Sequence, residues 1–210
     1  MTDVLAGLAQ LGVVPVVVLD DPATATQLGE ALMDGGLATA EVTLRTPSAL
    51  EAIKELAALP GMVVGAGTVV TPEQAASAVA AGAQYIVSPG FSRAVSAECA
   101  ALGVPLIPGA VTATEIMAAL EAGHRFVKFF PAEASGGIPT LKALSAPFAD
   151  VRFVPTGGIT ALTLDDYLRV PSVAAVGGTW IAPRDVLAAG DYATIAARAA
   201  HAVSIVREER

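Results

Sequence analysis

The sequence predicts a compact (β/α)8 TIM barrel with an extra N-terminal helix. Eight short apolar segments alternate with alanine-rich helical patterns along the 210-residue chain. The segments start about 20 to 26 residues apart, roughly the length of one strand, one helix and two short loops. The first segment is not followed by the Gly-x-Gly-x-x-Gly turn of a doubly wound sheet, which is the alternative fold. We therefore expect a single barrel domain spanning residues 1–210.

The predicted strands are apolar runs rich in β-branched and aromatic residues. They begin near Val13, Ala38, Met62, Gln84, Val104, Arg125, Val151 and Val173. Helical patterns lie between them, among others at Ala23–Asp34, Ser48–Leu59, Pro72–Ala81 and Thr114–Ala122. The hydroxyl of Thr71 can cap the helix that Pro72 begins, and Gly35-Gly36 is a typical helix end.

Composition excludes several classes of protein. Hydrophobic residues make up 54% of the chain and charged residues 15%, which excludes a disordered protein. The net charge of −8 argues against nucleic acid as a partner, but backbone dipoles can still bind a small anion. No apolar stretch reaches the length of a membrane span, and Met1-Thr2-Asp3 lacks the basic start of a signal peptide. We therefore expect a cytoplasmic protein with no membrane partner.

The residues that commonly bind metals or form disulfides are few. Cys99 is the only cysteine, and we expect it to be buried in a helix. His124 and His201, the only histidines, have no cysteine or carboxylate partner at ligand spacing. The sequence therefore predicts no metal and no other cofactor.

Lys128 lies in the apolar run Arg125-Phe126-Val127-Lys128-Phe129-Phe130-Pro131. Strand alternation puts Phe126, Lys128 and Phe130 on one face. A lysine rarely occupies a buried strand unless it is paired or used chemically. An apolar environment disfavours the ammonium form, and the neutral amine is the form that attacks a carbonyl to make a Schiff base. The alternative is a strand-end lysine that reaches water or pairs with a carboxylate.

The second strand carries Glu41, Thr43 and Arg45 at alternate positions, with Val42 and Leu44 between them. The apolar pair should pack against helices, which turns the three polar side chains toward the barrel interior. One interpretation is a structural ion pair between Glu41 and Arg45. In the other, Glu41 transfers protons and the planar guanidinium of Arg45 binds a substrate carboxylate.

Paired glycines follow the last two strands, in Pro155-Thr156-Gly157-Gly158-Ile159 and in Gly177-Gly178-Thr179. Glycine lets backbone amides approach an anion closely, and we expect the N-terminus of the following helix to add positive potential. The loops after strands seven and eight are a frequent phosphate site in this barrel. The pattern therefore predicts a phosphorylated ligand.

Together these segments resemble the KDPG/KHG aldolase family, class I aldolases that act on 2-keto-3-deoxy-6-phosphogluconate (KDPG). The resemblance covers nearly the whole chain. The matching segments are Val13-Val14-Pro15-Val16, Glu41-Val42-Thr43-Leu44-Arg45-Thr46, Gly65-Ala66-Gly67-Thr68-Val69, Ser88-Pro89-Gly90, Lys128-Phe129-Phe130-Pro131-Ala132-Glu133, Pro155-Thr156-Gly157-Gly158-Ile159 and Gly177-Gly178-Thr179-Trp180. It implies a metal-free homotrimer that cleaves KDPG to pyruvate and D-glyceraldehyde 3-phosphate in the Entner–Doudoroff pathway.

The resemblance also implies a role for each matching residue. The lysine at position 128 would form the Schiff base, and the glutamate at position 41 would be the acid/base. The residues that hold the pyruvyl carboxylate would be Arg45 and Thr68, and those that line the substrate pocket would be Pro89, Phe130 and Thr156. The phosphate would lie against Gly157, Gly158, Gly178 and Thr179. Relatives often carry serine at the last position, and threonine keeps the hydroxyl donor.

Several functions compete with KDPG cleavage. A galactonate-series aldolase would share the lysine and the glutamate, but Val16, Arg45 and Thr156 match the gluconate-type pattern better. Side activity on 4-hydroxy-2-oxoglutarate (KHG) is compatible with the shared pyruvyl half. A phosphate-barrel isomerase or epimerase would use Glu41 as a simple base and leave Lys128 without a role. A non-catalytic assembly subunit predicts no convergence of these side chains on one cavity.

Overall fold

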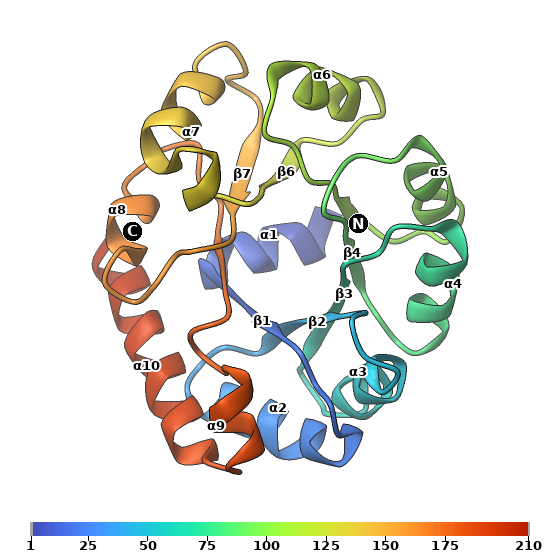
Figure 1. Ribbon diagram of the computed structural model, residues 1–210, viewed down its shortest axis with the longest axis vertical. Coiled ribbons are helices and arrows are strands. Elements are labelled where there is room, and N and C mark those ends of the chain that lie inside the picture. Colours follow the sequence, from blue (N-terminus) through green and yellow to red (C-terminus); the bar gives the residue numbers. More distant parts are fainter. Residues whose placement is uncertain (1, 210) are drawn as a thin grey trace.

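The computed structural model describes residues 2–209, and its strands alternate with helices in the predicted order. The strands are β1 (Val13–Val17), β2 (Thr39–Thr43), β3 (Val63–Gly67), β4 (Tyr85–Val87), β5 (Leu106–Ile107), β6 (Phe126–Phe129), β7 (Arg152–Pro155) and β8 (Val176–Gly178). The α-helices are α1 (Thr2–Leu11), α2 (Ala25–Asp34), α3 (Ala49–Ala57), α4 (Pro72–Ala80), α5 (Arg93–Ala101), α6 (Ala113–Glu121), α7 (Gly137–Ser145), α8 (Leu164–Leu168), α9 (Arg184–Ala188) and α10 (Tyr192–Glu209). Two 3-10 turns, η1 (Pro22–Thr24) and η2 (Glu133–Ser135), complete the list. The strands lie at the centre, and most helices surround them (Figure 1).

The strands form a curled, parallel sheet rather than one continuous eight-stranded ladder. Six strands pair in the order β5-β4-β3-β2-β1-β8, and β6 pairs with β7 in a separate two-stranded sheet. Isolated parallel bridges join the two sheets at Gly109–Lys128, Phe153–Val173 and Thr156–Gly177. The α/β class is thus confirmed, and the predicted barrel is confirmed only in part. Pro108, beside β6, and Pro155, beside β8, lack the N–H that would continue a ladder, which shortens the pairing at the two junctions.

Local sequence signals explain the helix boundaries. Thr71 and Gln74 form a reciprocal capping box at the start of α4, with Pro72 at its first position. Gly35 ends α2, and Gly36 follows with a positive φ of 84°. The pattern predicted at Ala23–Asp34 begins instead with the 3-10 turn η1, because Pro22 and the Asp21 cap shape the first turn. No helix between residues 2 and 209 is long and apolar enough to span a membrane.

The apolar core has two layers. The larger one fills the space between the strands and the surrounding helices, and Val42 and Cys99 belong to it. The smaller one lies inside the strands, where Tyr85 and Val154 pack with Leu8 of α1. In Figure 1, α1 lies across the middle of the strands. Val63 and Phe126, which begin β3 and β6, pack against this inner layer. The expected N-terminal helix therefore covers the end where strands begin and leaves their carboxyl ends free.

Candidate active site

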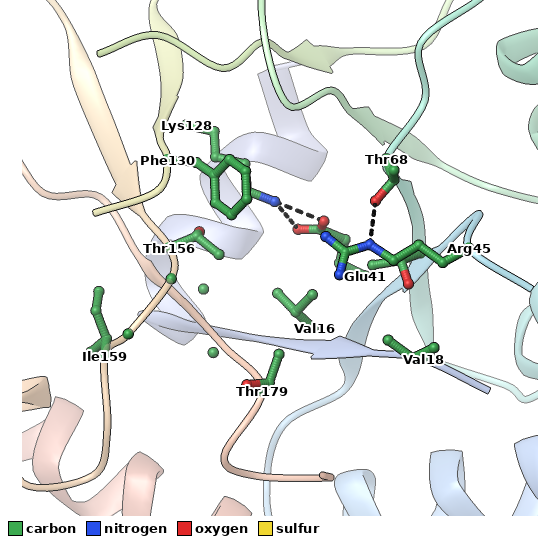
Figure 2. A pocket seen from close by; sticks show the side chains of 15 residues that line it. Val16, Val18, Glu41, Arg45, Thr68, Lys128, Phe130, Thr156, Ile159 and Thr179 are labelled. Atoms are coloured by element: carbon green, nitrogen blue, oxygen red, sulfur yellow. Dashed lines mark hydrogen bonds and ion pairs between the residues drawn. The ribbon is translucent and has the colours of Figure 1, made fainter. Parts of the chain in front are cut away.

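A cavity of about 120 Å³ opens among the carboxyl ends of the strands. It is lined by Val16, Val18, Glu41, Thr43, Arg45, Thr68, Lys128, Phe130, Thr156, Gly157, Gly158, Ile159, Gly177, Gly178 and Thr179. Figure 2 shows side chains from opposite sides of the fold converging on it. The structure thus brings together all but one of the site residues that the sequence predicted.

Lys128 and Glu41 form a buried ion pair across this cavity. Lys128 Nζ donates to Glu41 Oε1 at 2.9 Å and to Oε2 at 3.3 Å (Figure 2). Only 6% of Lys128 and 3% of Glu41 is exposed. Among residues 2–209, Glu41 has no ion pair with Arg45, so the local pairing that the sequence allowed is not formed. The arrangement places a proton acceptor in direct contact with a buried amine.

Two neighbours shape the surroundings of the ion pair. A Cβ atom at Gly67 would lie 2.2 Å from Glu41 Oε1, so only glycine leaves room for this carboxylate. The aromatic ring of Phe130 lies on the other side, with its centroid 5.3 Å from Lys128 Nζ. The ring is apolar yet attracts a cation through its face, so it can accommodate both charge states of the amine.

Arg45 and Thr68 lie together at the mouth of the cavity. The Nε–H of Arg45 donates to Thr68 Oγ1 at 3.3 Å, as Figure 2 shows. Thr68 has a φ of 61°, in the left-handed region that non-glycine residues rarely adopt. Such strain is typical of functional positions, where the surrounding structure holds the residue in place. The remaining N–H groups of the guanidinium can bind a carboxylate in the cavity.

The opposite side of the cavity presents backbone amides. Gly157 and Gly158 have positive φ angles of 103° and 83°. Within residues 2–209, the N–H groups of Gly158 and Ile159 donate to no protein acceptor, whereas the N–H of Gly157 is directed toward Gly177 in the parallel bridge between Thr156 and Gly177. Free backbone donors in residues that line a cavity suit an anion. The following helix begins only at Leu164, so loop amides, and not the predicted helix N-terminus, supply the donors.

Packing explains a glycine of β8 and the position of Pro89. A Cβ atom at Gly177 would lie 2.2 Å from Thr156 Oγ1, so this glycine lets Thr156 face the cavity. Pro89 is exposed and lies outside the cavity lining, in contrast to its predicted pocket position. Its carbonyl oxygen lies against Gly109 instead, where a Cβ atom would come within 2.1 Å of it. The backbone after β4 therefore packs against the loop that contains Gly109.

Val18 and Ile159 also line the cavity, although the sequence patterns predicted no pocket role for either residue. Both are apolar residues in the segments that follow a strand, Val18 directly after β1 and Ile159 in the loop after β7, and this placement could have identified them. Cys99 is buried, His124 bonds Ser96 Oγ at 2.7 Å, and His201 is exposed on α10. Across residues 2–209, no three His, Cys, Asp or Glu side chains are placed to hold a metal ion.

Comparisons with known proteins agree with this geometry. The family model for KDPG and KHG aldolase matches residues 4–198. The chain is 46% identical to the 2-dehydro-3-deoxy-phosphogluconate aldolase of Treponema pallidum, covering 98% of this chain and 99% of that protein. It is 45% identical to the KHG/KDPG aldolase of Escherichia coli K12, covering 91% and 90%.

Solved structures of similar proteins have the same fold. The KDPG aldolase of Zymomonas mobilis ZM4 with 3-phosphoglycerate superposes with a TM-score of 0.91 at 43% identity, covering 96% of this chain and 95% of that one. The KDPG aldolase of Legionella pneumophila, with pyruvate captured as a covalent carbinolamine, gives a TM-score of 0.89 at 42% identity, covering 94% and 95%. A native KDPGal structure gives 0.83 at 30% identity, also covering 94% and 95%.

Proposed function

Because the chain belongs to the KDPG and KHG aldolase family, we propose that it is a class I aldolase. As a carbon–carbon lyase, it cleaves 2-dehydro-3-deoxy-6-phosphogluconate to pyruvate and D-glyceraldehyde 3-phosphate. The observation that carries this proposal is the 2.9 Å contact between the buried Lys128 amine and Glu41. The covalent pyruvate adduct of the Legionella enzyme supports the same chemistry.

The first steps form the imine. Glu41 takes a proton from the Lys128 ammonium group, and the neutral amine then attacks the C2 carbonyl carbon of the substrate. Glu41 returns its proton to the resulting carbinolamine hydroxyl, which leaves as water. The product is a protonated imine between Lys128 and C2, and its positive charge makes it an electron sink.

Carbon–carbon cleavage follows from that charge. Glu41, again a carboxylate, takes the proton of the C4 hydroxyl, and the C3–C4 bond breaks to give the aldehyde. The bonding electrons move into the imine and leave an enamine on Lys128. Proton return from Glu41 to C3 and hydrolysis of the imine release pyruvate and restore the amine. No step requires a metal, because the imine supplies the electrophile.

The two ends of the cavity fit the two charged ends of the substrate. Arg45 and Thr68 bind the pyruvyl carboxylate beside the ion pair. The amides of Gly158 and Ile159, with Gly157, Gly178 and Thr179, bind the phosphate on the other side. Phe130 and Thr156 lie between these two ends and contact the carbon chain.

Residues that line the cavity also indicate which substrate of the family this protein prefers. The pattern of Val16, Arg45 and Thr156 favours the gluconate series over the galactonate series, and all three line the cavity. Cleavage of KHG is a second activity, supported by the name KHG/KDPG aldolase of the Escherichia coli relative. An isomerase or epimerase would use Glu41 as a base and leave the buried Lys128 without a chemical role.

The proposal also includes the closure of the barrel, the oligomeric state and the location of the protein. We infer that the three bridges between the sheets close them into one (β/α)8 barrel, and that residues 1–210 form one domain. A homotrimer would cover part of a surface that the 54% hydrophobic composition makes apolar, which light scattering can test. A cytoplasmic location stays a prediction from the sequence.

Borohydride trapping tests the central step. The protein is incubated with pyruvate and sodium borohydride, and the modified peptide is identified by mass spectrometry. The reduced adduct is expected on Lys128 alone. Lys54 of α3 and Lys142 of α7 are exposed and serve as internal controls. Labelling of either control at the level of Lys128, or no labelling at all, would contradict the Schiff-base mechanism.

A further inference from the structure

Glu133 contacts the start of the phosphate-binding loop, residues 156–163, and the helix that follows the loop. Its backbone N–H donates to the carbonyl oxygen of Gly157 at 3.0 Å, where the loop begins. Its carboxylate accepts a hydrogen bond from the hydroxyl of Tyr167, on helix α8 just after the loop. One residue, placed just after the strand that carries Lys128, therefore holds the start of the loop and the helix that ends it.

Burial of Tyr167 stabilises its hydrogen bond to Glu133. The Tyr167 side chain is fully buried, and its aromatic ring belongs to the main core. Burial, reinforced by the hydrogen bond to Glu133, raises the pKa of the Tyr167 phenol, which therefore stays a proton donor at neutral pH. Hydrogen bonds to a charged acceptor are stronger than those between neutral groups.

Glu133 also lies directly against the anion-binding glycines. A Cβ atom at Gly158 would come within 2.6 Å of the Glu133 Cβ atom. The neighbouring Ala132 N–H donates to Thr156 O at 2.8 Å, which extends the contact by one residue. Any shift of Glu133 would therefore move the amides of Gly157 and Gly158.

We propose that Glu133 and Tyr167 are positioning residues for the phosphate half of the substrate, holding the amides of the loop in their anion-binding arrangement. This inference rests on the proposed aldolase function. Neither residue lines the cavity, so both act through the loop. Their loss should weaken binding of a phosphorylated substrate and leave imine formation by pyruvate, which has no phosphate, largely intact.

Three variants test this inference. Tyr167→Phe removes the donor, Glu133→Ala removes the acceptor, and Glu133→Gln keeps a neutral oxygen that can still accept from Tyr167. For the first two we expect KM for KDPG, and Ki for inorganic phosphate, to rise roughly three- to tenfold. The rate of pyruvate trapping on Lys128 should change less than about twofold. Glu133→Gln should restore much of the affinity.

Matched controls separate this effect from a general loss of stability. Tyr192→Phe on α10 and Glu55→Ala on α3 make the same chemical changes away from the loop, and melting temperatures are measured for all variants. If the Tyr167→Phe variant does not fold, the test relies on Glu133→Ala, which changes an exposed side chain.

The inference is overturned if KM for KDPG matches the controls, or if KM and trapping worsen together in proportion to the loss of stability. A wild-type protein that neither cleaves KDPG nor forms the Lys128 adduct would instead refute the proposed function itself, and the inference with it.

Discussion

The two ends of the cavity are built from different parts of the chain. At the pyruvyl end, side chains make the contacts: Lys128 and Glu41 are only 6% and 3% exposed, and Arg45 is exposed at the mouth of the cavity. At the end where we propose that the phosphate binds, the free donors are the backbone amides of Gly158 and Ile159, and Gly158 and Thr179 are exposed. Proton transfer needs titratable groups held in contact, whereas anion binding needs only a chain conformation with free N–H groups. The two ends should therefore respond differently to substitution.

The largest effect is expected from Glu41→Gln at the pyruvyl end. The amide cannot accept the proton of Lys128, so kcat should fall by roughly a hundred- to ten-thousandfold. The fold should persist because the amide has nearly the same shape, although loss of the counter-ion of Lys128 can cost about 3 kcal/mol of stability. Steady-state kinetics and thermal unfolding measure the two effects, with Glu51→Gln on α3 as the control. An unchanged kcat would reduce Glu41 to a structural partner of Lys128.

A smaller effect is expected from Gly67→Ala, which changes the position of Glu41 but not its chemistry. The added methyl group would lie 2.2 Å from Glu41 Oε1 and must push the carboxylate away from Lys128. A displacement of about 1 Å in a catalytic group can cost around a hundredfold, so we expect kcat to fall ten- to a hundredfold. Gly7→Ala on α1 is the matched control, because nothing lies within 4 Å of its added atom. Wild-type kinetics in Gly67→Ala would mean that the Glu41 geometry tolerates displacement.

The smallest effect is expected at the phosphate end, from Thr179. Thr179→Glu puts a carboxylate at the anion site and should raise KM for KDPG about tenfold or more by charge repulsion, while Thr179→Ala should raise it only severalfold. Pyruvate trapping on Lys128 should remain near the wild-type rate in both. Equal losses of KDPG affinity and trapping would show that the two ends are not independent.

Gly158 is a poorer probe of the same site. A side chain there would point at Glu133, 2.6 Å away, and would need the positive φ of 83° that L-residues rarely adopt. Its substitution would deform the loop rather than add charge to the anion site.

Much of this arrangement was predictable from local patterns. Strand alternation identified the shared face of Lys128 and Phe130, because successive side chains in a strand point to opposite sides. The same rule turned Glu41 and Arg45 inward, and the glycine pairs marked the loops with free amides. Strand alternation does not predict which side chain each of these groups will contact. Arg45 is four positions from Glu41, yet it lies beyond the end of β2 and its side chain is exposed at the mouth of the cavity.

The sequence by itself therefore determined the order of strands and helices, the burial of Lys128 and the family to which the chain belongs. These features rest on periodicity, capping residues and glycine conformation, which act over a few neighbouring positions. Only the tertiary structure decided that Glu41 meets Lys128, 87 residues along the chain, and that Glu133 meets Tyr167. It also turned Pro89 out of the cavity and interrupted the ladder beside β6. These outcomes depend on how strands curl and loops pack in three dimensions, which no local pattern records.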